Sequence, residues 1–319
     1  CGALIVLPAA ILAQDPDATP TYRLTQTYVR ELASQNSLLF RMPVTIKGRT
    51  QSVHGVGEDC EMHLAGSAGV KIGFPGQVVV EPPNLCKNDP PAALGGSWGD
   101  VFDTHVLNKS CTAVGFPRLY AEHLKNGKPP ANPPHMVEIH PAMALECGSA
   151  QPISFASFLT IHSGMAAILE TSVEKCLVGF KLWVRRATVN NKAEYQFFED
   201  RPGPCGNFAV VDAVVDPRYV RAVNGGHSAI AQVWTGDAGP FPLKLYSYAN
   251  TPEDATIAAI GTGGNEEPDS TLALHGMLTV DYFAVLKTAR TTNGSWRALS
   301  GWTPVKFPLA LVVFGKAVE

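Results

Sequence analysis

Short extended runs separated by glycine and proline are the feature that most limits the fold of this chain. Between Phe40 and Cys147 the sequence offers about five or six such runs in roughly 105 residues. The run 77–81 is typical, because three valines end at Pro82-Pro83. Strands this short and this closely spaced are typical of a small closed or half-open barrel. The pattern therefore predicts an OB-like small barrel over about 40–148.

The remainder of the chain predicts a second domain. An amphipathic helix over 21–36 leads into the barrel, because its apolar residues fall on one helical stripe. After a Gly- and Pro-containing boundary near 148–152, hairpins and short capped helices predict a β-rich α+β domain. Residues 272–286 fit a strand or a helix equally well. The expected fold class is mainly β with short helices, in domains 21–148 and 149–319, and no internal repeat is visible.

The first residues indicate export. Residues 1–14 are apolar and are followed at once by the polar stretch 15–20. The run is too short to span a bilayer and is typical of the apolar core and cleavage site of a signal peptide. The other interpretation is a buried first strand. We expect residues 1–20 to be a truncated export signal and leader of a secreted or periplasmic protein.

The cysteine count agrees with export. Apart from Cys1, the chain has six cysteines, which permit three disulfides with 15 pairings. The domain boundary places four of these cysteines in the first domain and two in the second. Pairing is therefore predicted within the first domain for four of them, and between Cys176 and Cys205. No pair has the C-x-x-C spacing of a zinc knuckle, which disfavours a cysteine-based zinc site.

Charge and hydropathy limit the partners. The net charge is −3, the pI is about 6.3, and no run of Lys or Arg occurs. Electrostatic wrapping of nucleic acid is disfavoured by this balance. No apolar stretch is long enough for a membrane-spanning helix. The expected partner is an unidentified small molecule or protein.

Two short acid and histidine patterns are the candidate functional residues. The first contains Asp59, Glu61 and His63, and the second contains Glu138 and His140. Side chains two apart on a strand point the same way, so each pattern should present one polar face. If both faces belong to one barrel, their side chains should share one space.

The chemistry of this cluster has three interpretations. Imidazole and carboxylate are the usual ligands of a divalent metal such as Zn in a thiol-free site, which would use Asp59, His63, Glu138 and His140. The catalytic candidates, with or without metal, are Glu61, His63, Glu138 and His140. The structural alternative is a pair of Glu–His hydrogen bonds on neighbouring strands. His54, His105 and the run 120–123 could add a ligand, although a single loop histidine is more often solvated.

The first domain resembles a group of uncharacterised exported bacterial proteins. Their motifs run D-x-D-x-H-L, an apolar strand ending E-x-P…C, T-G-V-G-F-F-D…H-G, and A-P-N-x-(I/L)-E-L-H-P-V. This chain has matching segments in the same order at 59–64, 77–86, 111–116 and 131–141. It departs where Glu61 replaces the second Asp, Ala113 replaces a Gly, and Pro117-Arg118 replaces Phe-Asp. The resemblance covers about 40–147, implies an exported barrel-like protein, and carries no activity.

The sequence thus predicts an exported bacterial protein of one of two functional classes. The leading interpretation is a ligand- or partner-binding protein with an acid/His metal site. The alternative is a metal-dependent hydrolase, for example of phosphodiesters, that uses the Glu/His cluster.

Overall fold

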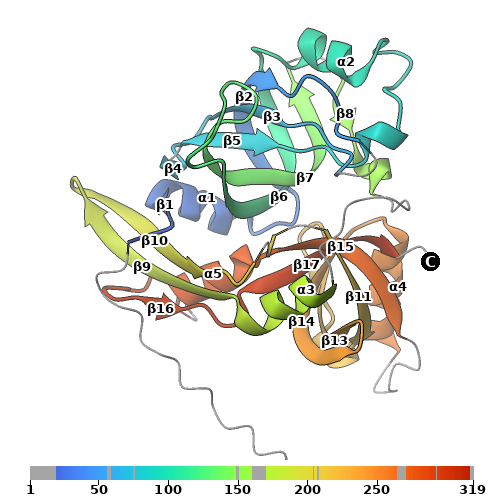
Figure 1. The fold of residues 1–319 in the computed structure, drawn as a ribbon. Helices are drawn as coiled ribbons and strands as arrows, with labels where there is room; N and C mark the ends of the chain where they lie inside the picture. Colours follow the sequence, from blue (N-terminus) through green and yellow to red (C-terminus); the bar gives the residue numbers. More distant parts are fainter. Residues whose placement is uncertain are drawn as a thin grey trace, which may run out of the picture.

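The structure is a computed structural model, and it describes residues 19–55, 59–74, 76–148, 151–159, 170–203, 205–206, 208–263, 271–291 and 293–316. Within these residues the chain is mainly β, with two closed five-stranded barrels and a further five-stranded sheet. Figure 1 shows the barrels as two lobes that pack against each other. The fold class predicted from the sequence is confirmed. The export signal predicted for residues 1–20 lies almost wholly outside the described residues.

The first barrel has the predicted OB-like form. Its strands are β2 (Phe40–Arg49), β3 (Leu64–Ala68), β5 (Gln77–Val80), β6 (Ser110–Glu122) and β7 (His135–Cys147). They follow the order β5-β3-β2-β6-β7, and a parallel pairing of β5 with β7 closes the barrel. The short η1 (Leu85–Lys87) and α2 (Trp98–His105) come between the third and fourth barrel strands.

The second half also forms a closed barrel, which the α+β prediction did not specify. Its strands are β11 (Phe208–Val215), β13 (Gly226–Thr235), β14 (Ala238–Tyr248), β15 (Leu272–Val280) and β17 (Leu309–Lys316). In both barrels the first strand pairs with the second and the fourth, and the third runs parallel to the fifth. The two barrels therefore share one topology without a visible sequence repeat.

Short elements complete this barrel. They are η3 (Pro217–Tyr219), β12 (Arg221–Val223), α4 (Pro252–Thr262) and α5 (Tyr282–Ala289). Like α2 in the first barrel, α4 comes between the third and fourth strands. The ambiguous segment 272–286 contains both predicted structures, because β15 ends at Val280 and Asp281 caps the N-terminus of α5.

A third sheet joins distant parts of the chain. It has the order β16 (Thr303–Pro304), β9 (Lys181–Val189), β10 (Lys192–Asp200), β1 (Tyr22–Thr25) and β4 (Gly73–Phe74). The predicted helix over 21–36 was therefore wrong in its first turn, because β1 pairs with β10. The helix α1 (Gln26–Gln35) begins after Thr25, whose side chain accepts a hydrogen bond from the Tyr28 backbone.

The remaining short elements flank the predicted domain boundary. They are β8 (Ile153–Ser154), η2 (Ala156–Phe158) and α3 (Glu170–Gly179). By pairing, β8 belongs to the sheet of the first barrel. The division into 21–148 and 149–319 stays a prediction. No helix in the described part of the chain is long and apolar enough to cross a bilayer.

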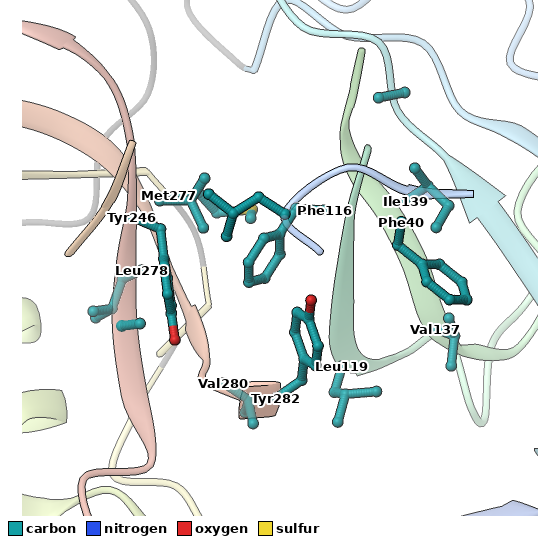
Figure 2. Close-up of a cluster of buried hydrophobic side chains, with 14 of the residues drawn as sticks. Phe40, Phe116, Leu119, Val137, Ile139, Tyr246, Met277, Leu278, Val280 and Tyr282 are labelled. Atoms are coloured by element: carbon teal, nitrogen blue, oxygen red, sulfur yellow. The ribbon is translucent and has the colours of Figure 1, made fainter. Parts of the chain in front are cut away.

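Strands β6 and β7 are buried on both of their faces. The burial of β2 alternates along the strand, whereas that of β7 is nearly continuous from His135 to Met143. One face fills the first barrel, and the second barrel covers part of the other. Phe116 of β6 packs 6.0 Å from Tyr246 and 5.4 Å from Tyr282, between ring centroids, as Figure 2 shows. The Tyr282 hydroxyl also donates to the Ser37 carbonyl at 2.5 Å.

The predicted cysteine pairing is confirmed. The disulfides join Cys60 to Cys86, Cys111 to Cys147, and Cys176 to Cys205, across 26, 36 and 29 residues. Loop closure over such lengths stabilises a fold by about 3.5 kcal/mol for each bridge, through restriction of the unfolded chain.

The shared interface predicts that the barrels unfold together. We expect Phe116→Ala to lower the free energy of unfolding by about 3–5 kcal/mol, because it leaves a cavity between the two barrels. Far-UV and near-UV circular dichroism should report one transition in urea, shifted as a unit. The exposed substitution Val178→Ala should change stability by less than about 0.5 kcal/mol. Two resolved transitions, with one unaffected by Phe116→Ala, would contradict the prediction.

Candidate acid and histidine site

Both sequence patterns reach one pocket on the first barrel. The pocket has a volume of about 260 Å³ and is lined by His54, Asp59, Glu61, His63, Glu81, Arg118, Tyr120, Glu122, His123, Asn132, His140 and Gly206. Four of the five residues of the two patterns are in this set. The fifth, Glu138, lies behind the lining and contacts Arg118 and His140.

The first pattern is extended without being a regular strand. We expected Asp59, Glu61 and His63 on a strand, but β3 begins at Leu64. The segment nevertheless runs beside 50–54, because the Glu61 carbonyl accepts from the His54 amide at 2.8 Å and the His63 carbonyl from the Thr50 amide at 3.1 Å. Cys60 has a left-handed backbone (φ = 62°), so strand alternation is interrupted there, and Cys60, Glu61 and Met62 are all buried.

The second pattern lies on a strand, as predicted. Glu138 and His140 belong to β7, and both are buried. A third carboxylate joins them from β5. The Glu81 amide donates to the Ile139 carbonyl at 3.0 Å, and the Glu81 carbonyl accepts from the Ala142 amide at 2.9 Å. This extension of the parallel β5–β7 pairing places Glu81 beside His140.

Glu61, Glu81 and His140 form a buried cluster, here called the inner group. His140 Nδ1 lies 2.5 Å from Glu81 Oε2, and His140 Nε2 lies 3.0 Å from Glu61 Oε1. His140 Nδ1 also lies 3.0 Å from Arg118 Nη1, so this nitrogen stands between a carboxylate, which accepts, and a guanidinium, which donates. Both atoms of the Glu61 Oε1–His140 Nε2 pair are buried, and among the described residues neither has a hydrogen-bond partner beyond the opposing atom.

Burial controls the ionisation of this group. Loss of solvent raises the pKa of Glu61 to about 7, with a smaller rise from the charge of Glu81 and an opposing effect of His140. For His140, burial alone would lower the pKa, but the charges of Glu61 and Glu81 raise it well above its usual value. Glu61 therefore changes its charge near neutral pH.

A second cluster of His54, Asp59 and His63, here called the outer group, is partly exposed. His54 Nδ1 lies 2.7 Å from Asp59 Oδ1, and His63 Nδ1 lies 2.7 Å from the Asn132 amide oxygen. The Asn132 contact makes Nδ1 the donor, so His63 presents Nε2 to Glu81 Oε1 at 3.3 Å. Since the other oxygen of Glu81 contacts His140, this one carboxylate connects the two groups.

A third cluster, around Glu138, has its charge balanced by its own neighbours and is here called the closed cluster. Glu138 receives Arg118 Nη1 at 2.6 Å and His135 Nε2 at 2.9 Å. The other nitrogen of His135 lies 2.8 Å from the Pro133 carbonyl, so both ring nitrogens donate. Burial would lower the pKa of His135, but the hydrogen bond and charge of Glu138 outweigh it and raise the pKa to about 9. Arg118 and charged His135 thus compensate Glu138.

The second half of the chain supplies one wall of the pocket. Gly206 lies so close to Tyr120 that a Cβ at this position would be 2.4 Å from the ring. The Tyr120 ring in turn has the Arg118 guanidinium 4.0 Å from its centroid and that of Arg201 at 4.7 Å. The neighbouring Cys205 is fixed by its disulfide to Cys176. The first barrel alone therefore does not complete the site.

The structure divides the predicted metal ligands among the three clusters. Asp59 and His63 belong to the outer group, His140 to the inner group, and Glu138 to the closed cluster, which also holds Glu122. Of the additional candidates, His54 and part of 120–123 line the pocket, whereas His105 at the end of α2 does not.

Sequence reasoning missed several residues of the site. Glu81 was noted only as the end of a strand, yet an acid directly before Pro82-Pro83 is a signal that could have found it. Arg118 was visible as a departure from the D of the related motif. Asn132 lies in the proline-containing segment 126–134 before β7, and His135 is the first residue of β7; both fall in the segment 131–141 of the resemblance, but neither was singled out.

The pKa of His135 predicts a pH dependence of stability. The folded protein keeps a proton that the unfolded chain, with a pKa near 6.5, releases as the pH rises toward 9. The free energy of unfolding should therefore fall with rising pH across this window, by on the order of 2–3 kcal/mol.

Urea unfolding at several pH values measures this decrease. His135→Asn should flatten the slope above pH 6.5, whereas the matched substitution His105→Asn should retain it. An unchanged slope in His135→Asn would assign the proton to another group.

Comparison of the chain with protein-family models, with curated proteins and with solved structures found no match.

Proposed function

We propose that the protein is an exported metal-dependent hydrolase whose pocket holds a divalent cation in the inner group. The observation that carries the proposal is the pair Glu61 Oε1 and His140 Nε2, which are buried, 3.0 Å apart and without a further hydrogen-bond partner among the described residues. Buried polar atoms are normally satisfied, and a shared cation satisfies both atoms at once. The three disulfides support the export part of the proposal.

Charge balance supports a cation at this place. Glu61, Glu81 and Glu138 are all buried, and the closed cluster already uses Arg118 and His135 for Glu138. Glu61 and Glu81 then remain, with His140 beside both and His63 beside Glu81. Burial of carboxylates is costly when their charges are incompletely compensated, and a divalent ion offsets both charges. Carboxylate and imidazole are also the donor set expected for Zn in a site without thiolates.

The hydrogen bonds around the rings fit metal ligation. A ligating histidine generally donates its second ring nitrogen to an acceptor, which fixes the tautomer. His63 donates Nδ1 to Asn132, and His140 Nδ1 lies 2.5 Å from Glu81 Oε2. Both rings therefore present Nε2 to the pocket side of the cluster. In this arrangement Glu81 orients His140 and links it to the outer group.

The outer group would supply a proton acceptor for the hydrolysis. A divalent cation lowers the pKa of a bound water and polarises the bond under attack. The His54–Asp59 pair has the form of a base held by an orienting carboxylate, and it lies on the pocket wall. Asp59 keeps its charge, because the hydrogen bond and charge of His54 outweigh burial and lower its pKa. A volume of about 260 Å³ admits a small substrate or one reacting group.

Metal analysis tests the site. Protein purified without chelators should contain about one divalent ion per chain, and Glu61→Gln should weaken metal binding by at least about tenfold. Adding metal at about 100 times its Kd should raise Tm by roughly 5–10 °C in the native chain. The surface substitution Glu146→Gln, which removes a carboxylate paired with Arg41, should change neither result. Absence of metal binding would refute the proposal.

Turnover distinguishes hydrolysis from binding. The loaded protein should cleave the test phosphodiester bis(4-nitrophenyl) phosphate, and a chelator should abolish the activity. His54→Gln should lower kcat by about 10²–10⁴-fold while metal content stays unchanged, as expected for loss of a proton acceptor. Stoichiometric metal without turnover of phosphodiesters or carboxylic esters would instead support a metal-dependent ligand-binding protein.

A further inference from the structure

A second, larger cavity lies on the outer face of the second barrel. It has a volume of about 590 Å³ and lies between the start of β14, the helix α5 and the segment 303–307. Small-molecule sites typically have roughly 300–1,000 Å³, so the cavity is of ligand size. It shares no lining residue with the acid and histidine pocket.

The body of this cavity is apolar and partly exposed. Ile230, Leu243 and Phe283 contribute to its wall. Phe307 at its rim is 67% exposed, and its backbone has φ = 50°. A left-handed conformation is unfavourable for a bulky residue, and such strain is concentrated at functional sites. Phe307 thus presents an aromatic ring to solvent at the edge of the apolar cavity.

The rim is basic. Four cations line the cavity, Lys244, Lys287, Arg297 and Lys306, against a single carboxylate, Asp281, among the described lining residues. Asp281 is already engaged, because it caps α5, accepts from the Tyr246 hydroxyl at 2.8 Å and pairs with Lys244 at 3.6 Å. Within the described chain the other three cations form no ion pair. Three uncompensated positive charges therefore surround an apolar cavity.

We propose that this cavity binds an organic anion with a long apolar body, of the fatty-acid class. The apolar wall and Phe307 would take the hydrocarbon chain, and Lys287, Arg297 and Lys306 would take the carboxylate. Charge and apolar area together favour such a ligand over two simpler ones. A small inorganic anion would leave the apolar wall wet, and a neutral lipid would make no use of the exposed Lys287, Arg297 and Lys306.

Isothermal titration calorimetry with sodium dodecanoate, below its micelle concentration, tests the site. The full-length protein should bind dodecanoate with one-to-one stoichiometry, and dodecyltrimethylammonium should not bind. Lys287→Gln and Lys306→Gln should each weaken binding by about threefold to tenfold, and together by more than either alone. The control Lys87→Gln, on the first barrel, should leave the affinity unchanged. Equal binding of the cationic amphiphile, or full affinity in the double variant, would overturn the proposal.

Two further measurements distinguish a small-molecule site from a membrane-binding surface, and the lipid proposal from the metal proposal. Co-sedimentation with vesicles of anionic phospholipid, without binding of free dodecanoate, would assign this face to a membrane surface and overturn the small-molecule site. Glu61→Gln should bind dodecanoate with the affinity of the native chain. Failure of the lipid site would therefore leave the metal proposal untouched, and loss of metal would leave the lipid site untouched.

Discussion

The burial of three carboxylates in the wall of one small barrel is the constraint on which the rest of the site depends. Glu138 on β7, Glu81 just after β5 and Glu61 just before β3 are all buried. Each must then find a positive partner or give up its charge. Glu138 has two such partners, whereas Glu61 has the raised pKa of an acid without enough compensation. The proposed metal site therefore lies where the negative charges of the buried carboxylates are least compensated.

The second barrel is what makes this burial possible. Without it the outer faces of β6 and β7 would be open to water, and the carboxylates would behave as ordinary surface acids. Phe116 anchors the covering barrel through Tyr246 and Tyr282, and Phe208 at the start of β11 packs 5.9 Å from the His140 ring. A perturbation of the interface should therefore alter the ionisation of the pocket before it unfolds either barrel.

The sequence predicts local elements better than it predicts which distant elements contact each other. Strand periodicity identified β7 with Glu138 and His140, and the cysteine count and domain boundary correctly predicted the division of the disulfides between the two halves. Closure of the second barrel depends on pairings such as β11 with β13, which no local pattern contains. The partner of Glu138 was missed for the same reason. Arg118 is 20 residues away and becomes adjacent only through the β6–β7 register.

The two barrels share one topology but place different residues at the same strand pairing. In each, the third strand lies parallel to the fifth, and this pairing brings distant side chains together. In the first barrel the pairing aligns Val79 with Glu138 and carries on to Glu81 beside His140. In the second it aligns Lys244 with Ala310, Leu245 with Leu311 and Tyr246 with Val312, and the buried Asp281 beside it is held by the Tyr246 hydroxyl and by Lys244. The acid and histidine site thus comes from the residues placed at this pairing, because the pairing itself is common to both barrels.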